Sequence, residues 1–216
     1  RSGTLGRLTA LIGALRDARA ALAAPRARRR ARRAAQELPR RRIHVIGVAR
    51  PEQAQTVARI RRELTRTRHE LALHLAPPAP GAGKWANINA ILASAPAAGA
   101  DWIVIVDDDV ALPRGFLDRF IALAEAFGFQ LAQPAHAFAS HAAWEVTRRR
   151  PGVLARRTRF VEIGPVTAIS ATAAEELLPF PDLRMGWGLD AHWSAIAAER
   201  GWPIGVVDAT PIRHLR

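Results

Sequence analysis

Residues 101–110 read DWIVIVDDDV, an apolar segment that runs directly into three consecutive carboxylates. The run 103–106 is continuously apolar and β-branched, which predicts a strand that is buried on both faces. Asp107, Asp108 and Asp109 would repel one another at the end of this strand unless a cation lies between them. Because open α/β sheets bind ligands at the carboxyl ends of their strands, we expect the functional site here.

The overall composition limits the classes of protein to consider. The 216 residues suffice for one sizeable domain with an additional arm, and the longest apolar runs have the length of strands, not of membrane spans. The absence of cysteine excludes disulfides and thiolate metal sites and fits a reducing compartment, so we expect a cytoplasmic protein. We also expect the chain to be truncated at its C-terminus.

The positive charge is concentrated in an N-terminal arm. The formal net charge is +13, and residues 1–42 contain 13 arginines against two acidic residues. A dense basic run, RARRRARRAAQELPRRR, begins at Arg26. Before it, apolar side chains recur at helical spacing, namely Leu5, Leu8, Ile12 and Leu15. The pattern predicts a basic, partly helical arm over residues 1–41.

This arm suggests a peripheral place on the inner face of a membrane. A basic segment with apolar side chains at helical spacing is suited to an anionic membrane surface. The alternatives are a solvated helical lead-in and a misassigned start of the coding frame. Nucleic acid is not an expected partner, because the arm has no aromatic side chains for stacking on bases and no nucleic-acid motif accompanies it.

From residue 42 the pattern alternates between strands and helices. It predicts strands at 42–49, 70–76, 103–106 and 129–134, and helices that begin at Pro51, Lys84 and Pro113. This β-α-β-α-β-α-β order predicts an α/β fold, with a mostly parallel, Rossmann-like sheet flanked by helices and right-handed crossovers.

The chain after residue 135 is less regular. We expect a mobile excursion over 141–158, a strand and turn over 159–170, helices at 172–180 and 191–200, and a final strand with a tail over 202–214. Domain 42–216 would then consist of a nucleotide-binding half at about 42–135 and an acceptor half at about 136–216.

With these motifs in this order, the sequence resembles the nucleotide-sugar glycosyltransferases of the GT-A fold and is most similar to glycosyltransferase family 2. The resemblance covers about residues 42–214. It rests on the acidic strand end, on GAGKWANINAIL at 81–92, on the loop GWGLD at 186–190 and on the late His214. It implies an inverting, metal-dependent enzyme that passes a sugar from a nucleotide-diphosphate donor to a hydroxyl acceptor, which is a lipid, a glycan or a protein.

The resemblance also implies a metal site. In that family an Asp-x-Asp cluster holds a divalent cation against the donor diphosphate, and here Asp107 and Asp109 fill those places, with His214 at the position of a late metal-binding histidine. Mn²⁺ or Mg²⁺ at this position acts as a Lewis acid for the leaving group. An imidazole ligand shifts the preference somewhat toward Mn²⁺.

Further roles follow from the same resemblance. Lys84, Asn87, Asp107 and Asp108 are implied to bind the nucleotide sugar, and Asp190 takes the place of the catalytic base. Two departures from the family pattern bear on these roles. Leu189 stands where the family has Glu, and the strand at 70–76 ends without the acid that reads the base in many members.

Three residues are candidates for the acceptor site. Trp187 offers a surface for the apolar face of a sugar, and Gly188 lets backbone and sugar approach closely. Glu162, which we expect within a strand, is a candidate acceptor-site acid.

Each of these residues also has a purely structural interpretation. Asp190 is a candidate N-cap of the helix that follows it, Trp187 a core aromatic, and Glu162 a structural carboxylate with an ionic partner. A histidine near a chain end, such as His214, is commonly solvated. Lys84 and Asn87 are candidates for capping and solvating their helix.

Two other functions are compatible with parts of the sequence. The strand followed by DDDVAL also fits the Asp-x-Asp-x-Val signature of haloacid-dehalogenase-like phosphatases, with Asp107 as nucleophile and Asp109 as general acid. That class requires a downstream lysine, whereas the only lysine, Lys84, lies upstream. The third alternative is a non-catalytic, basic-armed module that binds a surface.

Overall fold

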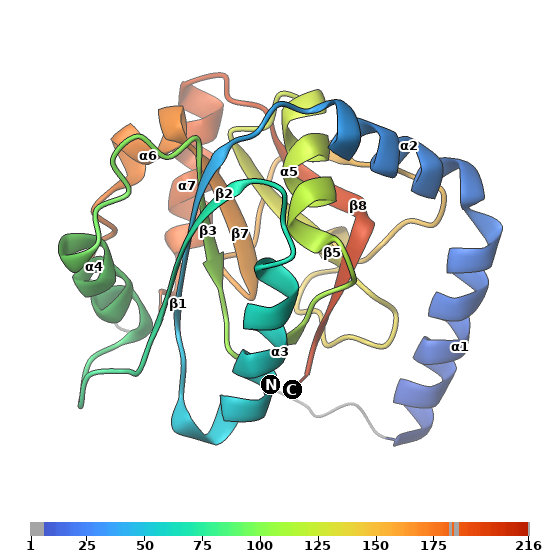
Figure 1. Cartoon of the computed structure of the whole chain (residues 1–216), viewed down its shortest axis with the longest axis horizontal. Coiled ribbons are helices and arrows are strands. Elements are labelled where there is room, and N and C mark those ends of the chain that lie inside the picture. Colours follow the sequence, from blue (N-terminus) through green and yellow to red (C-terminus); the bar gives the residue numbers. More distant parts are fainter. Residues whose placement is uncertain (1–6, 182, 184–185, 216) are drawn as a thin grey trace.

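The computed structural model describes residues 7–181, 183 and 186–215, so Leu5 of the predicted arm lies outside the described residues. A central sheet with helices on both faces forms the body of the described chain (Figure 1). Its strands are β1 (Arg42–Val48), β2 (Glu70–Ala76), β3 (Trp102–Val106), β4 (Val110–Ala111), β5 (Leu131–His136), β6 (Arg156–Thr158), β7 (Val166–Ser170) and β8 (Ile204–His214). The helices are α1 (Arg7–Ala23), α2 (Pro25–Glu37), α3 (Ala54–Leu64), α4 (Lys84–Ser94), α5 (Phe116–Ala126), α6 (Ala171–Leu177) and α7 (Leu189–Glu199), with short 3₁₀ turns η1 (Pro51–Gln53) and η2 (Glu145–Thr147).

The strand order explains both the success and the limit of the topology prediction. The order is β2-β1-β3-β7-β5-β8-β4, with β6 paired to β8. Among the described strands, β1, β2, β3, β5 and β8 run in one direction, so the sheet is mostly parallel as predicted. The antiparallel strand β7 lies between β3 and β5, although it follows both in the chain. The alternation of strands and helices along the sequence does not reveal that β7 is inserted between these two strands.

Two apolar layers cover the sheet, because side chains alternate between its faces along each strand. Val104 and Val106 of β3 pack with α3 and α5 on one face. Ile103 and Ile105 pack with α4, α6 and α7 on the other face. All five residues of β3 are buried, which confirms the prediction of a strand covered on both sides.

The N-terminal helices pack against this body. Ala31 of α2 is fully buried in the core layer that contains α5. Asp17 of α1 accepts hydrogen bonds from the backbone N–H groups of Phe138 (3.0 Å) and Ala139 (2.9 Å), and it forms an ion pair with Arg149 (3.1 Å). No described helix combines the length and apolar character that crossing a bilayer requires.

The second half of the chain contains more regular structure than its sequence pattern predicts. The segment 141–158 contains η2, with the buried Thr147, and the strand β6. The expected final strand is β8, and it continues to His214, where we expected a tail after the strand. In both places pairing with β8 organises residues whose own sequence pattern is weak.

Candidate active site

The three carboxylates lie on a cavity of about 500 Å³ at the carboxyl ends of the parallel strands β1, β2 and β3. Val48 at the end of β1, the loop after β2 and Asp107 after β3 all contribute to its wall. Because these strands are parallel, their carboxyl ends meet at one edge of the sheet, where α/β proteins bind ligands. The sequence prediction of a site at this position therefore corresponds to a real cavity.

Lys84 connects the first residue of α4 to the acidic segment. Its Nζ lies 2.6 Å from Oδ1 of Asp107 and donates to the backbone oxygen of Ile163 at 3.3 Å. The side chains of Lys84 and Asp107 are both 26% exposed, so a ligand in the cavity can reach the ion pair. The predicted nucleotide-site residues Lys84 and Asp107 thus lie together.

Arg50 neutralises the middle carboxylate. Its guanidinium donates to both oxygens of Asp108, from Nη2 to Oδ1 at 2.5 Å and from Nε to Oδ2 at 2.8 Å, and its backbone N–H donates to Oδ2 at 2.7 Å. Nη2 also donates to Oδ2 of Asp109 at 3.2 Å. These hydrogen bonds, led by those to Asp108, raise the pKa of Arg50 further above its ordinary value.

His214 lies beside the third carboxylate because β4 and β8 are paired, with Val110 opposite His214. Nε2 of His214 is 3.2 Å from Oδ1 of Asp109, and both line the cavity. His214 is therefore not the solvated terminal histidine of the alternative interpretation. Its backbone N–H donates to Oγ of Ser140 at 2.8 Å, which fixes this end of β8.

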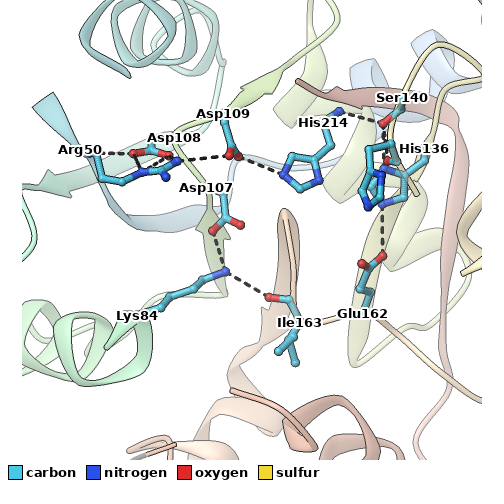
Figure 2. Close-up of polar contacts among 11 residues, drawn as sticks. Arg50, Lys84, Asp107, Asp108, Asp109, His136, Ser140, Glu162, Ile163 and His214 are labelled. Carbon is cyan, nitrogen blue, oxygen red and sulfur yellow. Dashed lines mark hydrogen bonds and ion pairs between the residues drawn. The ribbon is translucent and has the colours of Figure 1, made fainter. Parts of the chain in front are cut away.

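Figure 2 shows that each of the three neighbouring carboxylates points to a basic side chain. Asp107 contacts Lys84, Asp108 contacts Arg50, and Asp109 contacts both Arg50 and His214. Their mutual repulsion is therefore already compensated by basic side chains. The acidic run alone does not require a metal ion, contrary to the expectation from the sequence.

Asn87 is buried and organises the loop on which the cavity depends. Its Oδ1 accepts from the N–H of Ala79 at 2.7 Å, and its Nδ2 donates to the oxygens of Ala82 (3.3 Å) and Gly83 (2.8 Å). The side chain also lines the cavity. It thus shapes the wall of the predicted nucleotide site and does not merely solvate its helix.

A second cluster of polar side chains lies beside His214 and consists of Ser140, His136 and Glu162 (Figure 2). The buried His136 has Nδ1 3.1 Å from Oγ of Ser140 and Nε2 3.2 Å from Oε2 of Glu162. Glu162 precedes Ile163, whose carbonyl binds Lys84. The prediction that Glu162 lies within a strand is wrong, since β7 begins at Val166.

None of residues 186–190 of the loop GWGLD is among the described residues that line this cavity, although Gly186 lies close to the side chains of Trp85 and Ile163. The side chain of Trp187 is 85% exposed, which excludes the core-aromatic alternative. Gly188 is the N-cap residue of α7 in a left-handed conformation, so Asp190 lies in the first turn and is not the N-cap. Oδ1 of Asp190 accepts from the N–H of Ala191 at 2.9 Å.

The side chains at the cavity provide part of a ligand set for a divalent metal. Two ligands on adjacent corners of an octahedron with bonds of about 2.1 Å lie about 3 Å apart. The 3.2 Å separation of Asp109 Oδ1 and His214 Nε2 is close to this value. In the part of the chain that the structure describes, no group of three or more His, Asp and Glu side chains is arranged to hold a metal. The pair alone therefore suits only a cation whose other ligands come from a bound substrate.

Sequence reasoning assigns no role to Arg50 or His136. Arg50 follows the first strand and precedes Pro51, so its place at the ligand-binding edge of a parallel sheet was a usable signal. His136 offers no comparable signal, because its partner Glu162 is 26 residues away.

Comparisons with known proteins give a fold and no closer relationship. No protein-family model matches the sequence, and no curated protein matches it by sequence. The structure is similar to GalNAc-T7 with UDP, GalNAc and Mn²⁺ (TM-score 0.56, 11% identity, 82% of this chain and 44% of that chain).

Two further solved structures are similar to this chain. They are a Drosophila β1,4-galactosyltransferase 7 mutant with manganese, UDP-Gal and xylobiose (TM-score 0.51, 13% identity, 81% of this chain and 71% of that chain) and S. aureus TarS with UDP-GlcNAc (TM-score 0.50, 11% identity, 79% and 57%). The chain spans less than two thirds of the length of GalNAc-T7 and of TarS. At these identities the likeness defines the fold alone: this chain has the fold of the GT-A glycosyltransferases.

Proposed function

We propose that this chain is a glycosyltransferase that moves a sugar from a nucleotide-diphosphate donor to a hydroxyl acceptor. The observation that carries the proposal is the cavity at the end of β3, where Asp107, Asp109, Lys84 and His214 meet. The similar structures contain UDP or UDP-sugars, which supports a nucleotide-sugar donor. The phosphatase alternative lacks its downstream lysine, because the only lysine of the sequence, Lys84, lies upstream of the acidic run.

Two cations serve the donor diphosphate in this proposal. Departure of the nucleoside diphosphate leaves negative charge on its oxygens, and fixed positive groups stabilise that charge. Lys84 at the cavity wall supplies a point charge, and Arg50 supplies a planar guanidinium. Asn87 and Asp108 hold the two loops that carry these groups.

Asp109 and His214, with Asp107 beside them, are the residues that would hold Mn²⁺ or Mg²⁺. When bound, such an ion supplies Lewis-acid stabilisation of the diphosphate leaving group. The imidazole of His214 favours Mn²⁺ over Mg²⁺ within this pair of metals. The Mn²⁺ in two of the similar structures supports the same choice.

The acceptor half completes an inverting displacement. The acceptor hydroxyl gives its proton to Asp190 as its oxygen bonds to the anomeric carbon. The bond from that carbon to the diphosphate breaks, and its electron pair leaves with the diphosphate oxygen. A base for this step acts on the face of the sugar opposite the diphosphate, so it need not line the diphosphate cavity. Trp187 and Gly188 are proposed to contact the acceptor, together with Glu162.

Ligand-induced stabilisation tests this function. Nucleoside diphosphates and UDP-sugars are screened by thermal unfolding with and without Mn²⁺. At a concentration of about 100 Kd, we expect one of them to raise Tm by about 5 °C or more in the presence of Mn²⁺. Asp109→Asn should remove the Mn²⁺-dependent part of the rise and weaken Mn²⁺ binding measured by EPR, whereas Glu199→Gln, with the same charge change at the far end of α7, should not. An equal rise in both variants contradicts the site.

We also propose that the enzyme works at the surface of an anionic membrane. Five large apolar side chains on α1 are exposed, namely Leu8, Leu11, Ile12, Leu15 and Leu22. Small residues such as Gly13 and Ala20 form the face that packs on the body, so the leucines point outward. Co-sedimentation with phosphatidylglycerol vesicles should fall for the double variant Leu11→Ser, Leu15→Ser. Unchanged sedimentation would contradict this location.

A further inference from the structure

A second cavity, of about 660 Å³, lies between the helices α1 and α2 and the body of the domain. It shares no lining residue with the cavity at the end of β3. Six arginines from three separate segments surround it: Arg28 and Arg32 from α2, Arg114 and Arg119 from the start of α5 and the turn before it, and Arg149 and Arg150 from the chain before β6. Such convergence of like charge from distant segments is costly without a counter-ion.

The acidic residues of this cavity are too few to neutralise its six arginines. Only Asp118 and Asp208 join the described lining. Asp118 accepts hydrogen bonds from Thr67 Oγ1 and the N–H of Arg68. Asp208 accepts from the N–H of Arg150 at 2.7 Å and forms its ion pair with Arg156 at 3.0 Å, and Arg156 is not part of the lining. Both carboxylates make their direct contacts with other groups, and at longer range Asp118 attracts Arg119 and Asp208 attracts Arg150. Two negative charges nevertheless do not balance six positive ones.

Arg119 is held in place by the protein but receives no counter-charge through these bonds. Its Nε donates to the backbone oxygen of Gly115 at 2.9 Å, and its Nη2 donates to that of Arg114. Burial, followed by repulsion from Arg32, lowers the pKa of Arg119. A bound anion would offset both effects, since it would attract the guanidinium with a negative charge that the neutral carbonyl groups lack.

Arg149 is also only partly satisfied. Its side chain is 11% exposed, and its Nη1 is 3.1 Å from Asp17 Oδ1. Its Nε is buried and has no hydrogen-bond partner among the described residues. A buried N–H of a charged group without a partner is uncommon, and it indicates that a ligand or solvent completes the site.

Part of the cavity wall is apolar and consists mostly of small side chains. Ala20, Ala21, Ala24 and Ala27 of α1, α2 and their junction contribute to it, with Val153 and Pro211. This combination accommodates an anion attached to an organic group. The volume lies in the range of about 300–1,000 Å³ that is usual for small-molecule sites.

We propose that this arginine cavity binds a phosphoryl group carried by an organic molecule, as a phosphate monoester or diester. Guanidinium groups bind phosphate through paired, charge-assisted hydrogen bonds, and several at one place fit a group with several anionic oxygens. The same chemistry occurs in a phospholipid headgroup and in a soluble phosphorylated metabolite. The site goes beyond the proposed function, because it is separate from the donor cavity.

Calorimetry with sn-glycerol 3-phosphate tests the proposal directly. The double variant Arg28→Gln, Arg32→Gln removes two exposed arginines that make no side-chain hydrogen bond within the described chain, so it should remain folded. The matched control is Arg26→Gln, Arg30→Gln, which makes the same charge change on the same helix outside the cavity. We expect the first pair to weaken binding about tenfold or more and the control pair to change it by no more than about twofold.

Vesicles distinguish the two sources of the phosphate. If a lipid headgroup is the ligand, phosphatidylglycerol in phosphatidylcholine vesicles should compete with glycerol 3-phosphate, and the Arg28/Arg32 variant should bind these vesicles less than the control. If the ligand is soluble, glycerol 3-phosphate should bind without such competition. Both results support a phosphoryl site.

The proposal fails if the wild-type chain does not bind glycerol 3-phosphate, or if the two double variants weaken binding equally, as a general effect of charge would. Lys84→Gln separates this site from the donor cavity. That variant should reduce binding of nucleoside diphosphates and leave glycerol 3-phosphate binding unchanged. A loss of glycerol 3-phosphate binding in Lys84→Gln would assign the phosphate to the donor cavity and overturn the proposal.

Discussion

The guanidinium of Arg50 and the carboxylate of Asp108 form a two-pronged ion pair that ties the turn after β1 to the end of β3. The two residues are 58 positions apart in the chain. Asp108 is 5% exposed at its side chain, whereas Arg50 is 37% exposed. The pair therefore joins a buried anion to a cation that borders the donor cavity, and it makes the shape of that cavity depend on both strands.

Arg50→Gln should lower stability because it leaves the buried Asp108 with only the backbone N–H of residue 50 among its partners from the turn. We expect a loss of about 1–3 kcal/mol in the free energy of unfolding, measured by urea denaturation. Arg200→Gln breaks a pair with Glu176 that is 51% exposed on the arginine side, and its cost should be clearly smaller because solvent screens an exposed ion pair. Equal effects would show that Asp108 does not depend on Arg50.

Asp190→Asn should slow transfer without weakening donor binding. General-base catalysis contributes about 10²–10⁴ in rate, and we expect a decrease in kcat of that size. Donor affinity is measured by calorimetry on the same variant, and Glu199→Gln at the other end of α7 is the control with an equal charge change. Full activity in Asp190→Asn would remove this residue from the mechanism, and Glu162→Gln would be the next variant to test.

Substitution by alanine should lower the stability strongly at Gly186 and very little at Trp187. Gly186 has φ +76°, and a Cβ there would collide with the buried indole of Trp85 next to Lys84. Gly186→Ala should therefore cost about 2–4 kcal/mol of stability, measured by thermal or urea unfolding. Trp187→Ala should change stability by less than about 0.5 kcal/mol, because the side chain is exposed. Any effect of Trp187→Ala should appear in the KM for the acceptor, and a large loss of stability would contradict its exposed position.

Stability should fall as the pH drops below 6.5, the ordinary pKa of histidine. Burial, and then the neighbouring His74, lower the pKa of His44, and burial lowers that of His69. Above pH 6.5 both the folded and unfolded states hold these groups neutral. Below it the unfolded state takes up protons first, so the free energy of unfolding decreases.

Urea denaturation at pH 7.5 and 5.5 measures this effect. His44→Val removes one of the titrating groups, and the difference in stability between the two pH values should shrink relative to the wild-type chain. Because each protein is compared with itself at the two pH values, the direct effect of the substitution on the free energy of unfolding cancels. An unchanged difference would mean that His44 does not contribute to the acid sensitivity.

The local sequence pattern was sufficient to predict the central strands and helices, but it was not sufficient to predict which side chains meet at the site. The strand and helix order up to residue 135 follows from apolar periodicity and from Pro and Gly positions, which act over a few residues. The partners of the carboxylates follow no such rule. Arg50 and His214 reach Asp108 and Asp109 only because β1 pairs with β3 and β8 pairs with β4.

The sequence by itself determined that a buried strand carries three carboxylates to the ligand-binding edge of an α/β sheet, because hydrophobic burial and strand geometry are encoded in consecutive residues. The tertiary structure alone decided the insertion of β7 between β3 and β5, the distribution of the carboxylates among Arg50, Lys84 and His214, and the gathering of six arginines around a second cavity. These features depend on which distant segments become neighbours, and charges far apart in the chain interact only after the packing of the sheet and helices has brought them together.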